Sequence, residues 1–510
     1  MRSRLRSFVL DSLILSSWLL CVGMVFLHKH GQLWGGFGNP TSTLAATMDA
    51  KEQWFGLYYQ GQRIGFSQMT LVPEEREGVP GVGLMDRGRL SFNLLGVPQQ
   101  LEVSAQAFID ADWRLQEFSA AVRSATTQLQ WAGRRHGEEL LLTVTTPTSS
   151  VRKRLRDPAG SAFVNGLSSW AAFHRLRVGQ SGKAWVLNPL ALNPEAVYFH
   201  VRGRDVIEGQ NVLIVETDVS GLTTTSWVTP EGDVLKETSP LGWELRRESR
   251  DEALQRVTVL APQLDLLATV AVPIDRPIPE PERLERLVLL LEGIDAAQLS
   301  LQRPWQTVLA PARLASYHQT APAEPWCIVQ LDAPTIGTSA STSLDGGQRY
   351  QQASLFVQSD NPRIISKAAE IVGARTDPIE QAGALTQWVY QTLTKQFTVG
   401  LPSALDVLET PAGDCHEHTV LFTALARSLG IPTRMVAGLV YQAGQLYYHA
   451  WPEVWLHGQW IPTDPTLGER VADATHLGLV EAENESLLGL AQFVGKLRVH
   501  VLDMNPPPRP

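Results

Sequence analysis

Three residues of the types that cooperate in nucleophilic catalysis lie in the last quarter of the chain: Cys415, His449 and Asp464. A cysteine attacks as its thiolate, and a free thiol with a pKa of about 8.5 is mostly protonated at neutral pH. A nearby histidine can take the proton, and a carboxylate can hold the imidazole in the orientation that this transfer requires. The order of these residue types predicts a nucleophile, a general base and an orienting group.

Cys415 stands at the start of an expected helix. Asp414 is a good N-cap residue, so the cysteine takes the first helical position. Apolar residues then recur at three- and four-residue spacing, which gives the helix one face suited to a core: Val420, Leu421, Ala424, Leu425 and Leu429. Gly430 ends the helix, and Pro432 prevents its continuation. The helix dipole favours the thiolate, whereas the anionic Asp414 and Glu417 oppose it.

A strand is expected to carry His449, because the residues at 450, 452, 454 and 456 alternate with bulkier ones. A turn at 457–459 follows, and residues 460–464 return as the next strand. This antiparallel pair brings Asp464 close to His449. Two paired strands hold a histidine and a carboxylate together more firmly than a loop would.

The run GDCHEHTVLFTALARSLGIPTRMVAGLVY, which begins at Gly413, and the later HAWPEVWLHGQWIPTDPT resemble the core of the transglutaminase-like superfamily. The upstream SALDVL at 403–408 also resembles a segment usual before the cysteine in that family. The resemblance covers about residues 360–470 and implies a papain-like fold, in which a helix bearing the cysteine packs on an antiparallel sheet. It implies that Cys415 is the nucleophile, His449 the general base and acid, and Asp464 the orienting group.

Other interpretations of these residues stay open. A cysteine in an apolar helix is usually a small buried hydrophobic residue, and a catalytically inactive copy of such a domain would be a binding module of the cell envelope. Cys415 also clusters with His416 and His418, but the two histidines point to different sides of a helix, and no CxxC or HExxH spacing is present. We therefore expect no metal and no cofactor, and we expect both histidines to line the cleft rim or face solvent. Gln396 is a candidate oxyanion donor, by analogy with papain-like enzymes.

The composition sets the broad class of the protein. A chain of 510 residues with 44% hydrophobic and 19% charged residues is expected to fold into about three domains. The formal charge is 43 − 52 = −9, which argues against a nucleic-acid partner. Cys21, Cys327 and Cys415 are the three cysteines, and we expect no structural disulfide among them.

Residues 1–30 predict a transmembrane anchor. Three arginines, at positions 2, 4 and 6, precede an apolar run over residues 8–28 that can just span a bilayer. The arginine excess places the N-terminus in the cytoplasm and the bulk of the chain on the extracytoplasmic, periplasmic side. A cleaved signal peptide is the alternative, but small residues of an A-x-A site are missing directly after Leu27. We expect an uncleaved, single-pass anchor in the cell membrane.

The remaining segments predict an α+β chain in which β domains precede the transglutaminase-like domain. Short strands at 54–59, 140–145 and 212–217, and a hairpin of 224–229 with 234–238, indicate an antiparallel β domain with one helix near 166–176. Helices are expected at 363–372 and from 378, and further strands at 326–331 and 497–501. The predicted divisions are a linker (31–50), a mainly-β domain (51–260), a proline-rich connection (261–285), a small β domain (286–358), the catalytic domain (359–500) and a proline-rich tail (501–510).

These features predict an enzyme, cysteine protease-like or transglutaminase-like, that attacks peptide or amide bonds of a protein or peptide substrate through an acyl-enzyme. Water would release the acyl group in a peptidase or amidase, and an amine would release it in a cross-linking enzyme. We favour hydrolysis slightly, because it is common in prokaryotic relatives of the superfamily and no calcium-binding cluster stands out. Residues 401–480 hold eight acidic and three basic residues, which favours cationic substrates. The β domains could bind an envelope partner.

Overall fold

The computed structural model describes residues 50–505, apart from internal gaps, as two compact units that divide between Leu266 and Leu267. The gaps are residues 95–96, 112–113, 125–127, 147–149, 158–175, 189–192, 220–221, 231, 241, 256–270, 295, 299–302, 337–346, 355, 397–402, 483–492 and 494. The predicted anchor, linker and helix near 166–176 fall outside the described residues, apart from Ala50 and Leu176. Among the helices in the described part of the chain, none combines the length and apolar character needed to cross a membrane.

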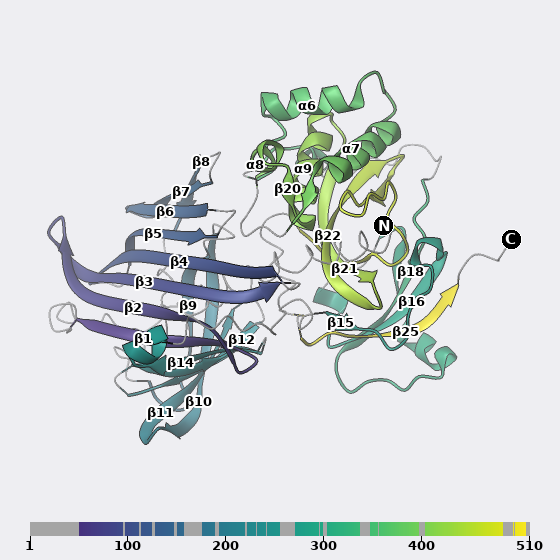
Figure 1. The fold of residues 1–510 in the computed structure, drawn as a ribbon. Helices are drawn as coiled ribbons and strands as arrows, with labels where there is room; N and C mark the ends of the chain where they lie inside the picture. Colours follow the sequence, from purple (N-terminus) through teal and green to yellow (C-terminus); the bar gives the residue numbers. More distant parts are fainter. Residues whose placement is uncertain are drawn as a thin grey trace. The chain divides into compact units, whose positions relative to one another are not determined.

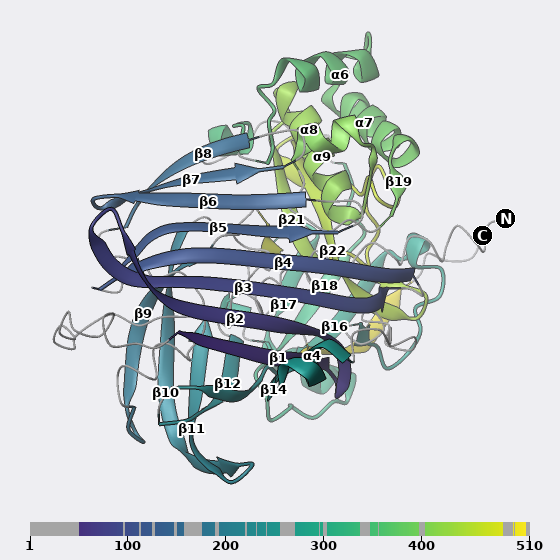
Figure 2. The ribbon, with the colours of Figure 1, turned by 60° about the vertical axis from the view of Figure 1, so that its left-hand side comes forward.

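The first unit is one antiparallel sheet of 14 strands (Figures 1 and 2). Its strands are β1 Lys51–Tyr59, β2 Gln62–Arg76, β3 Val79–Leu94, β4 Val97–Asp110, β5 Leu115–Arg123, β6 Gln128–His136, β7 Glu139–Thr145, β8 Ser150–Arg156, β9 Ser181–Asn188, β10 Asn193–Ile207, β11 Gln210–Val219, β12 Leu222–Val228, β13 Val234–Thr238 and β14 Trp243–Glu248, followed by helix α4 Arg250–Gln255. β1 pairs with β2 on one side and with β14 on the other. The first and last strands of the unit in chain order, β1 and β14, therefore lie side by side in the sheet. Successive hairpins extend the sheet from β1 to β8 at one edge and from β14 to β9 at the other.

Hairpin turns and alternating burial explain why this sequence forms a sheet. Two-residue turns at Gln60–Gly61, Glu77–Gly78 and Glu208–Gly209 have positive φ at both positions, the backbone that matches the twist of paired strands. In β7 every second residue is buried, so one face of the strand supplies the core. The strands predicted at 54–59, 140–145 and 212–217, and the hairpin of 224–229 with 234–238, are confirmed.

The second unit contains two antiparallel sheets, a two-stranded parallel pair and a group of helices (Figure 1). The larger sheet has the order β15-β22-β21-β24 with β23 on β22, and the smaller has the order β17-β18-β16-β25. The strands are β15 Val272–Pro273, β16 Arg286–Glu292, β17 Gln306–Leu309, β18 Trp326–Asp332, β19 Thr394–Lys395, β20 Ala412–Gly413, β21 Thr433–Gln442, β22 Gln445–Leu456, β23 Gln459–Pro462, β24 Leu477–Glu481 and β25 Arg498–Asn505. The α-helices are α6 Pro362–Val372, α7 Pro378–Thr392, α8 Ala404–Glu409 and α9 Cys415–Ser428.

The smaller sheet joins segments from both ends of this unit. β25 pairs with β16, whose residues Leu287–Leu291 are buried on both faces. Residues 501–505, which the sequence assigns to a proline-rich tail, are therefore strand, because their backbone completes the ladder beside β16. The strand predicted at 326–331 is confirmed as β18, with Cys327 buried.

Helix α9 is the centre of the second unit. It packs on β22 and β21, while α6, α7 and α8 also contact it (Figures 1 and 2). Every residue from Cys415 to Arg427 is buried, so the helix has no solvent-facing side. The predicted helices at 363–372 and from 378 are confirmed, and the side chain of Asp377 caps the second of these by accepting from the N–H of Ile379.

A buried ion network connects the turn before β17 to the larger sheet. The Glu453 carboxylate, on β22, accepts from Arg303 Nε at 3.0 Å and from Arg434 Nε at 2.7 Å. Arg434 also reaches Glu481 of β24 at 2.6 Å. The Glu453 side chain is fully buried, so its charge depends on these two guanidinium groups.

Replacing Glu453 with Gln should lower the free energy of unfolding of the second unit by about 3–5 kcal/mol, because it leaves two buried guanidinium charges without their shared carboxylate. Urea unfolding of the full chain measures the change. The matched control is Glu370→Gln, which removes an exposed carboxylate paired with Lys367 on the surface of α6 and should cost less than about 0.5 kcal/mol. Equal effects of the two substitutions would contradict the assigned role of Glu453.

Candidate active site

The start of α9 is fixed by a capping box. The Asp414 side chain accepts from the His416 N–H at 2.9 Å, and the Glu417 side chain accepts from the Asp414 N–H at 2.8 Å. A Cβ at position 413 would lie 2.3 Å from the Glu417 side chain, so Gly413 gives that side chain room to fold back. These contacts satisfy backbone donors that a helix N-terminus leaves free. They place Cys415 at the first helical position, as the sequence predicts.

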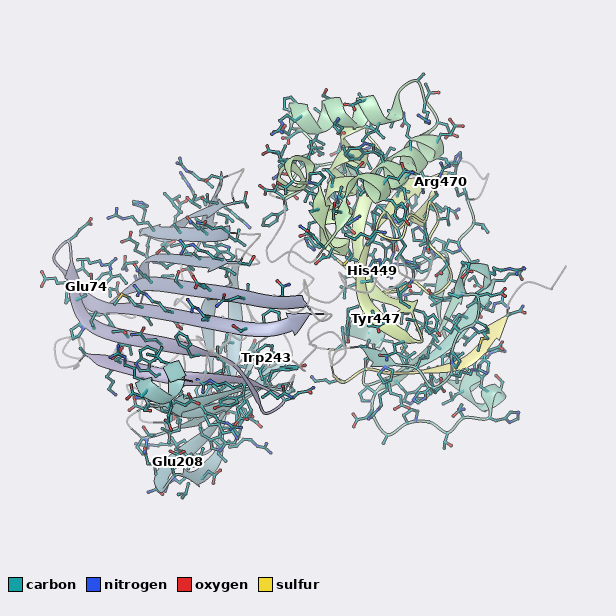
Figure 3. The ribbon with its side chains drawn as sticks, viewed as in Figure 1. Glu74, Glu208, Trp243, Tyr447, His449 and Arg470 are labelled. Carbon is teal, nitrogen blue, oxygen red and sulfur yellow. The ribbon has the colours of Figure 1, made fainter. Side chains whose placement is uncertain are left out.

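Cys415 faces the strand that carries His449. Thr419, one helical turn further on, donates its hydroxyl to the Ala450 carbonyl at 3.1 Å. The N–H of Ala450 itself bonds to the Cys415 thiol. Both contacts involve the residue next to His449, so the thiol side of α9 lies against β22 where the histidine is attached. Figure 3 shows His449 on that strand, two positions beyond Tyr447.

His449 and Asp464 form a direct contact in the interior. The Nε2 atom of His449 lies 2.6 Å from Asp464 Oδ2, and neither side chain is exposed. Since the carboxylate can only accept, the histidine donates through Nε2–H. Its Nδ1 atom is buried without a hydrogen-bond partner. The imidazole therefore presents a free lone pair on the nitrogen opposite to the one that Asp464 binds.

Asp464 lies just beyond the end of β23 and is held by the turn that follows it. Its backbone exchanges two hydrogen bonds with Glu469, and its Oδ1 accepts from the N–H groups of Thr466 and Leu467 at 2.7 and 3.0 Å. Burial opposes the charge of Asp464, but His449 and His476 hold the pKa of this carboxyl far below its usual range. The group is a carboxylate at neutral pH.

His476 is a component of the centre that the sequence does not identify. His476 Nε2 lies 3.2 Å from Asp464 Oδ2, and the His476 ring is 6.0 Å from that of His449. The edge of its ring meets Trp451, which in turn stacks on His449. Position 476 has no motif around it, and only the fold brings it to the carboxylate.

His416, His418 and Gln396 also lie near the start of α9. His416 and His418 were expected at the cleft rim or in solvent, and this is wrong, because α9 is covered on all sides and both are buried. His418 Nδ1 lies 2.6 Å from the Asp414 carbonyl, and burial lowers the pKa of His418 to about 4. Gln396 is exposed, and its backbone N–H donates to the Gly413 carbonyl at 3.3 Å. It lies near the helix start, and its role as an oxyanion donor stays a prediction.

The electrostatics of the centre favour an uncharged Cys415 and an uncharged His449 at rest. Burial and the neighbouring Asp414 raise the pKa of the Cys415 thiol well above its ordinary value. Burial lowers the pKa of His449, although Asp464 opposes this. A neutral imidazole with a free Nδ1 can act as a base.

The histidines and carboxylates around Asp464 are close enough to one another to be considered as metal ligands. The nearest ligating atoms of His449, Asp464 and His476 lie within 4.8 Å of one another, as do those of Glu469, Asp473 and His476. The imidazole nitrogens and carboxylate oxygens of the first set already bond directly to each other. A metal there would have to replace both bonds, so the structure explains the cluster as a hydrogen-bond network.

Asp464→Asn should destabilise the second unit by about 3 kcal/mol at pH 7, because it removes the anion that two buried imidazoles share. The folded pKa of Asp464 is depressed, so its contribution is present above the unfolded pKa of about 3.9 and is lost as the pH falls below it. Thermal melting from pH 7 to pH 3 should show a deficit for the variant that shrinks below about pH 4. Asp360→Asn, at an exposed carboxylate, is the control. A deficit independent of pH would contradict this assignment.

Comparisons with known proteins place this centre in a family. The family model described as the transglutaminase-like superfamily matches residues 365–465. Comparison with curated proteins gives no significant match. A candidate cysteine protease from Cytophaga hutchinsonii is 18% identical, with 44% of this chain aligned to 89% of that one and a TM-score of 0.28. A candidate protease from Parabacteroides distasonis is 10% identical, with 74% of this chain aligned to 68% of that one and a TM-score of 0.20.

A third similar structure, a protein of the DUF1089 family from Pseudomonas aeruginosa, is 15% identical over 40% of this chain and 94% of that one, with a TM-score of 0.18. All three TM-scores are below 0.5, so the family assignment depends on the sequence model and on the motifs that it spans. That model includes the N-terminus of α9, the strand of His449 and Asp464 itself. Residues 365–465 of this chain are a domain of the transglutaminase-like superfamily.

Proposed function

We propose that the protein is a thiol hydrolase or acyltransferase that acts on peptide or amide bonds through an acyl-enzyme at Cys415. The observation that supports this most strongly is the state of His449. Its Nε2–H is held by Asp464 at 2.6 Å, while its Nδ1 is buried and has no partner. The thiol of Cys415 lies against Ala450, the residue that follows His449 in β22. These contacts support the roles of nucleophile, base and orienting carboxylate that we propose for Cys415, His449 and Asp464.

In the proposed reaction, His449 Nδ1 takes the thiol proton as Cys415 Sγ attacks the substrate carbonyl carbon. The charge that develops on the carbonyl oxygen is stabilised by the backbone N–H of Cys415 at the positive end of α9. The imidazolium then gives its proton to the leaving amine, and the C–N bond breaks to leave a thioester. Water releases the acyl group as an acid, or an amine releases it as a new amide. We favour water slightly.

Cys415 and His449 are 1% and 2% exposed, so we propose that the structure around them opens before a substrate enters. Substrate binding would then supply part of the free energy of opening. We also propose that residues 8–28 anchor the protein in the cell membrane, with the domains on the periplasmic side. The 14-stranded sheet of the first unit would then be available to an envelope partner.

Transfer of an acyl group to Cys415 tests the proposal. The full chain is incubated with an activated ester, p-nitrophenyl acetate, and peptides that hold Cys415 or Cys327 are analysed by mass spectrometry. We expect acetyl-Cys415 to accumulate at early times, and we expect His449→Ala to slow its formation about 100-fold, because the general base is lost. Cys327→Ala, at a buried thiol of β18, is the matched control and should leave the rate unchanged.

The fate of the acyl group distinguishes the two reactions. Decay of acetyl-Cys415 at a rate that a lysine-bearing peptide does not change would indicate hydrolysis, and transfer to the lysine would indicate cross-linking. Acetylation of Cys415 that is no faster than that of Cys327, and that His449→Ala does not affect, would contradict catalysis. It would favour the alternative, a catalytically inactive binding module.

A further inference from the structure

Two histidines share one oxygen of Asp464. His449 Nε2 and His476 Nε2 lie 2.6 and 3.2 Å from Oδ2. The other oxygen of the same carboxylate accepts from two backbone N–H groups in the turn that follows. The carboxylate therefore accepts four hydrogen bonds and cannot rotate without losing several of them. His476 supplies one of the two bonds on the side that faces His449.

The second nitrogen of His476 also meets a carboxylate. Nδ1 lies 3.1 Å from Asp473 Oδ1, which is further bonded to the N–H and the hydroxyl of Thr475. Carboxylates only accept, so an imidazole between two of them donates through both nitrogens and carries a positive charge. The His476 side chain has no solvent exposure. The bonds to Asp464 and Asp473, rather than water, stabilise this charge.

The groups facing His476 come from two segments. Asp464, Glu469 and Asp473 lie in the segment between β23 and β24, and His449 faces it from β22. Burial raises the pKa of Glu469 to about 8, so this residue holds a proton at neutral pH while Asp464 is charged. Burial alone would lower the pKa of His476, but the bonds to Asp464 and Asp473 raise it well above its ordinary value.

We propose that His476 is a positioning residue of the active site, which holds Asp464 toward His449 and places a permanent positive charge beside the Cys415–His449 pair. This inference rests on the proposed function, since it assigns a role within the same site. His476 does not touch the reacting atoms. It acts through Asp464, and its charge makes it harder for the neighbouring imidazole to gain a proton.

The smaller sheet fixes the backbone that carries His476. Gly478, two residues later, donates its N–H to Gln306 Oε1 at 2.9 Å and accepts from Gln306 Nε2 at 2.8 Å. A Cβ on Gly478 would lie 2.9 Å from the Arg303 guanidinium, so the side chains of that turn fit closely against the strand. The position of His476 is therefore set by groups from both sheets of the second unit.

The positive charge of His476 determines in which direction its replacement shifts the pH dependence of Cys415 reactivity. Replacing an imidazolium with a neutral amide removes a cation, and the loss of a cation raises the pKa of every neighbouring group, whether thiol or imidazole. At low pH the thiol of Cys415 and the ring of His449 are both fully protonated. Cys415 becomes reactive as the pH rises and this pair of groups loses one proton. His476→Gln should therefore move the acidic limb of that reactivity to higher pH. Gln keeps a donor near the position of Nε2, so Asp464 retains a partner.

The test is the rate of alkylation of Cys415 by iodoacetamide in the full chain from pH 5 to pH 10, followed by mass spectrometry. We expect His476→Gln to shift the midpoint upward by about half a pH unit or more. The matched control is His418→Asn, at a second buried histidine. The pKa of His418 is about 4, so it is neutral in this range, and its replacement removes no charge and should not shift the midpoint. Thermal melting shows that each variant is folded.

Asp473→Asn provides a second, oppositely signed test that does not depend on the folding of the His476 variant. It removes an anion and leaves an acceptor for Nδ1–H, so the midpoint should move to lower pH. A folded His476→Gln protein with an unchanged midpoint, or an unchanged midpoint in Asp473→Asn, would overturn the role of His476. Indifference of wild-type Cys415 alkylation to His449→Ala at every pH would instead contradict the proposed function itself.

Discussion

The buried carboxylate of Asp464 is the constraint on which the rest of this centre depends. A fully buried anion is costly unless hydrogen bonds and opposite charges compensate for its lost hydration. Asp464 meets this requirement with two backbone N–H groups and two imidazoles. The tautomer of His449 follows from that arrangement, because the nitrogen facing Asp464 must carry the hydrogen. The opposite nitrogen is left without a hydrogen and can accept a proton.

The surrounding elements hold the two sides of the centre at fixed positions. Helix α9 is enclosed on all sides, and a capping box defines its first turn, so Cys415 has little freedom. β22 carries His449, and the turn that follows β23 carries Asp464. The ion network around Glu453 connects these strands to the turn that begins at Arg303.

Much of the candidate site can be predicted from local sequence, because its parts are local structures. The cap at Asp414, the apolar spacing after Cys415 and the alternation around His449 each involve a few consecutive residues. His476 could not be found in this way. It lies 12 residues after Asp464, and its place depends on a turn and on contacts with Gln306 that no short motif encodes. Its two carboxylate partners are visible only in three dimensions.

The errors in the fold have a similar origin. An apolar stripe predicts a helix with one face in solvent, but α9 is covered by helices and by a sheet, which is why His416 and His418 are buried. β25 completes a sheet with β16, more than 200 residues earlier in the chain. β1 likewise pairs with β14, which is far from it in the chain. Periodicity identifies some of the individual strands, but it cannot show which strand each one pairs with.

The most direct test of the account is the protonation state of the His449 ring at neutral pH, measured by nitrogen-15 NMR of histidine side chains in the full chain. The signal is assigned by its loss in His449→Gln. We predict a neutral ring with hydrogen on Nε2 and none on Nδ1, and we predict that alkylation of Cys415 changes the Nδ1 signal. A hydrogen on Nδ1 would contradict the account in either case: with Nε2 bare, the tautomer would be the opposite of the one that Asp464 requires, and with both nitrogens protonated, the resting ring would be charged.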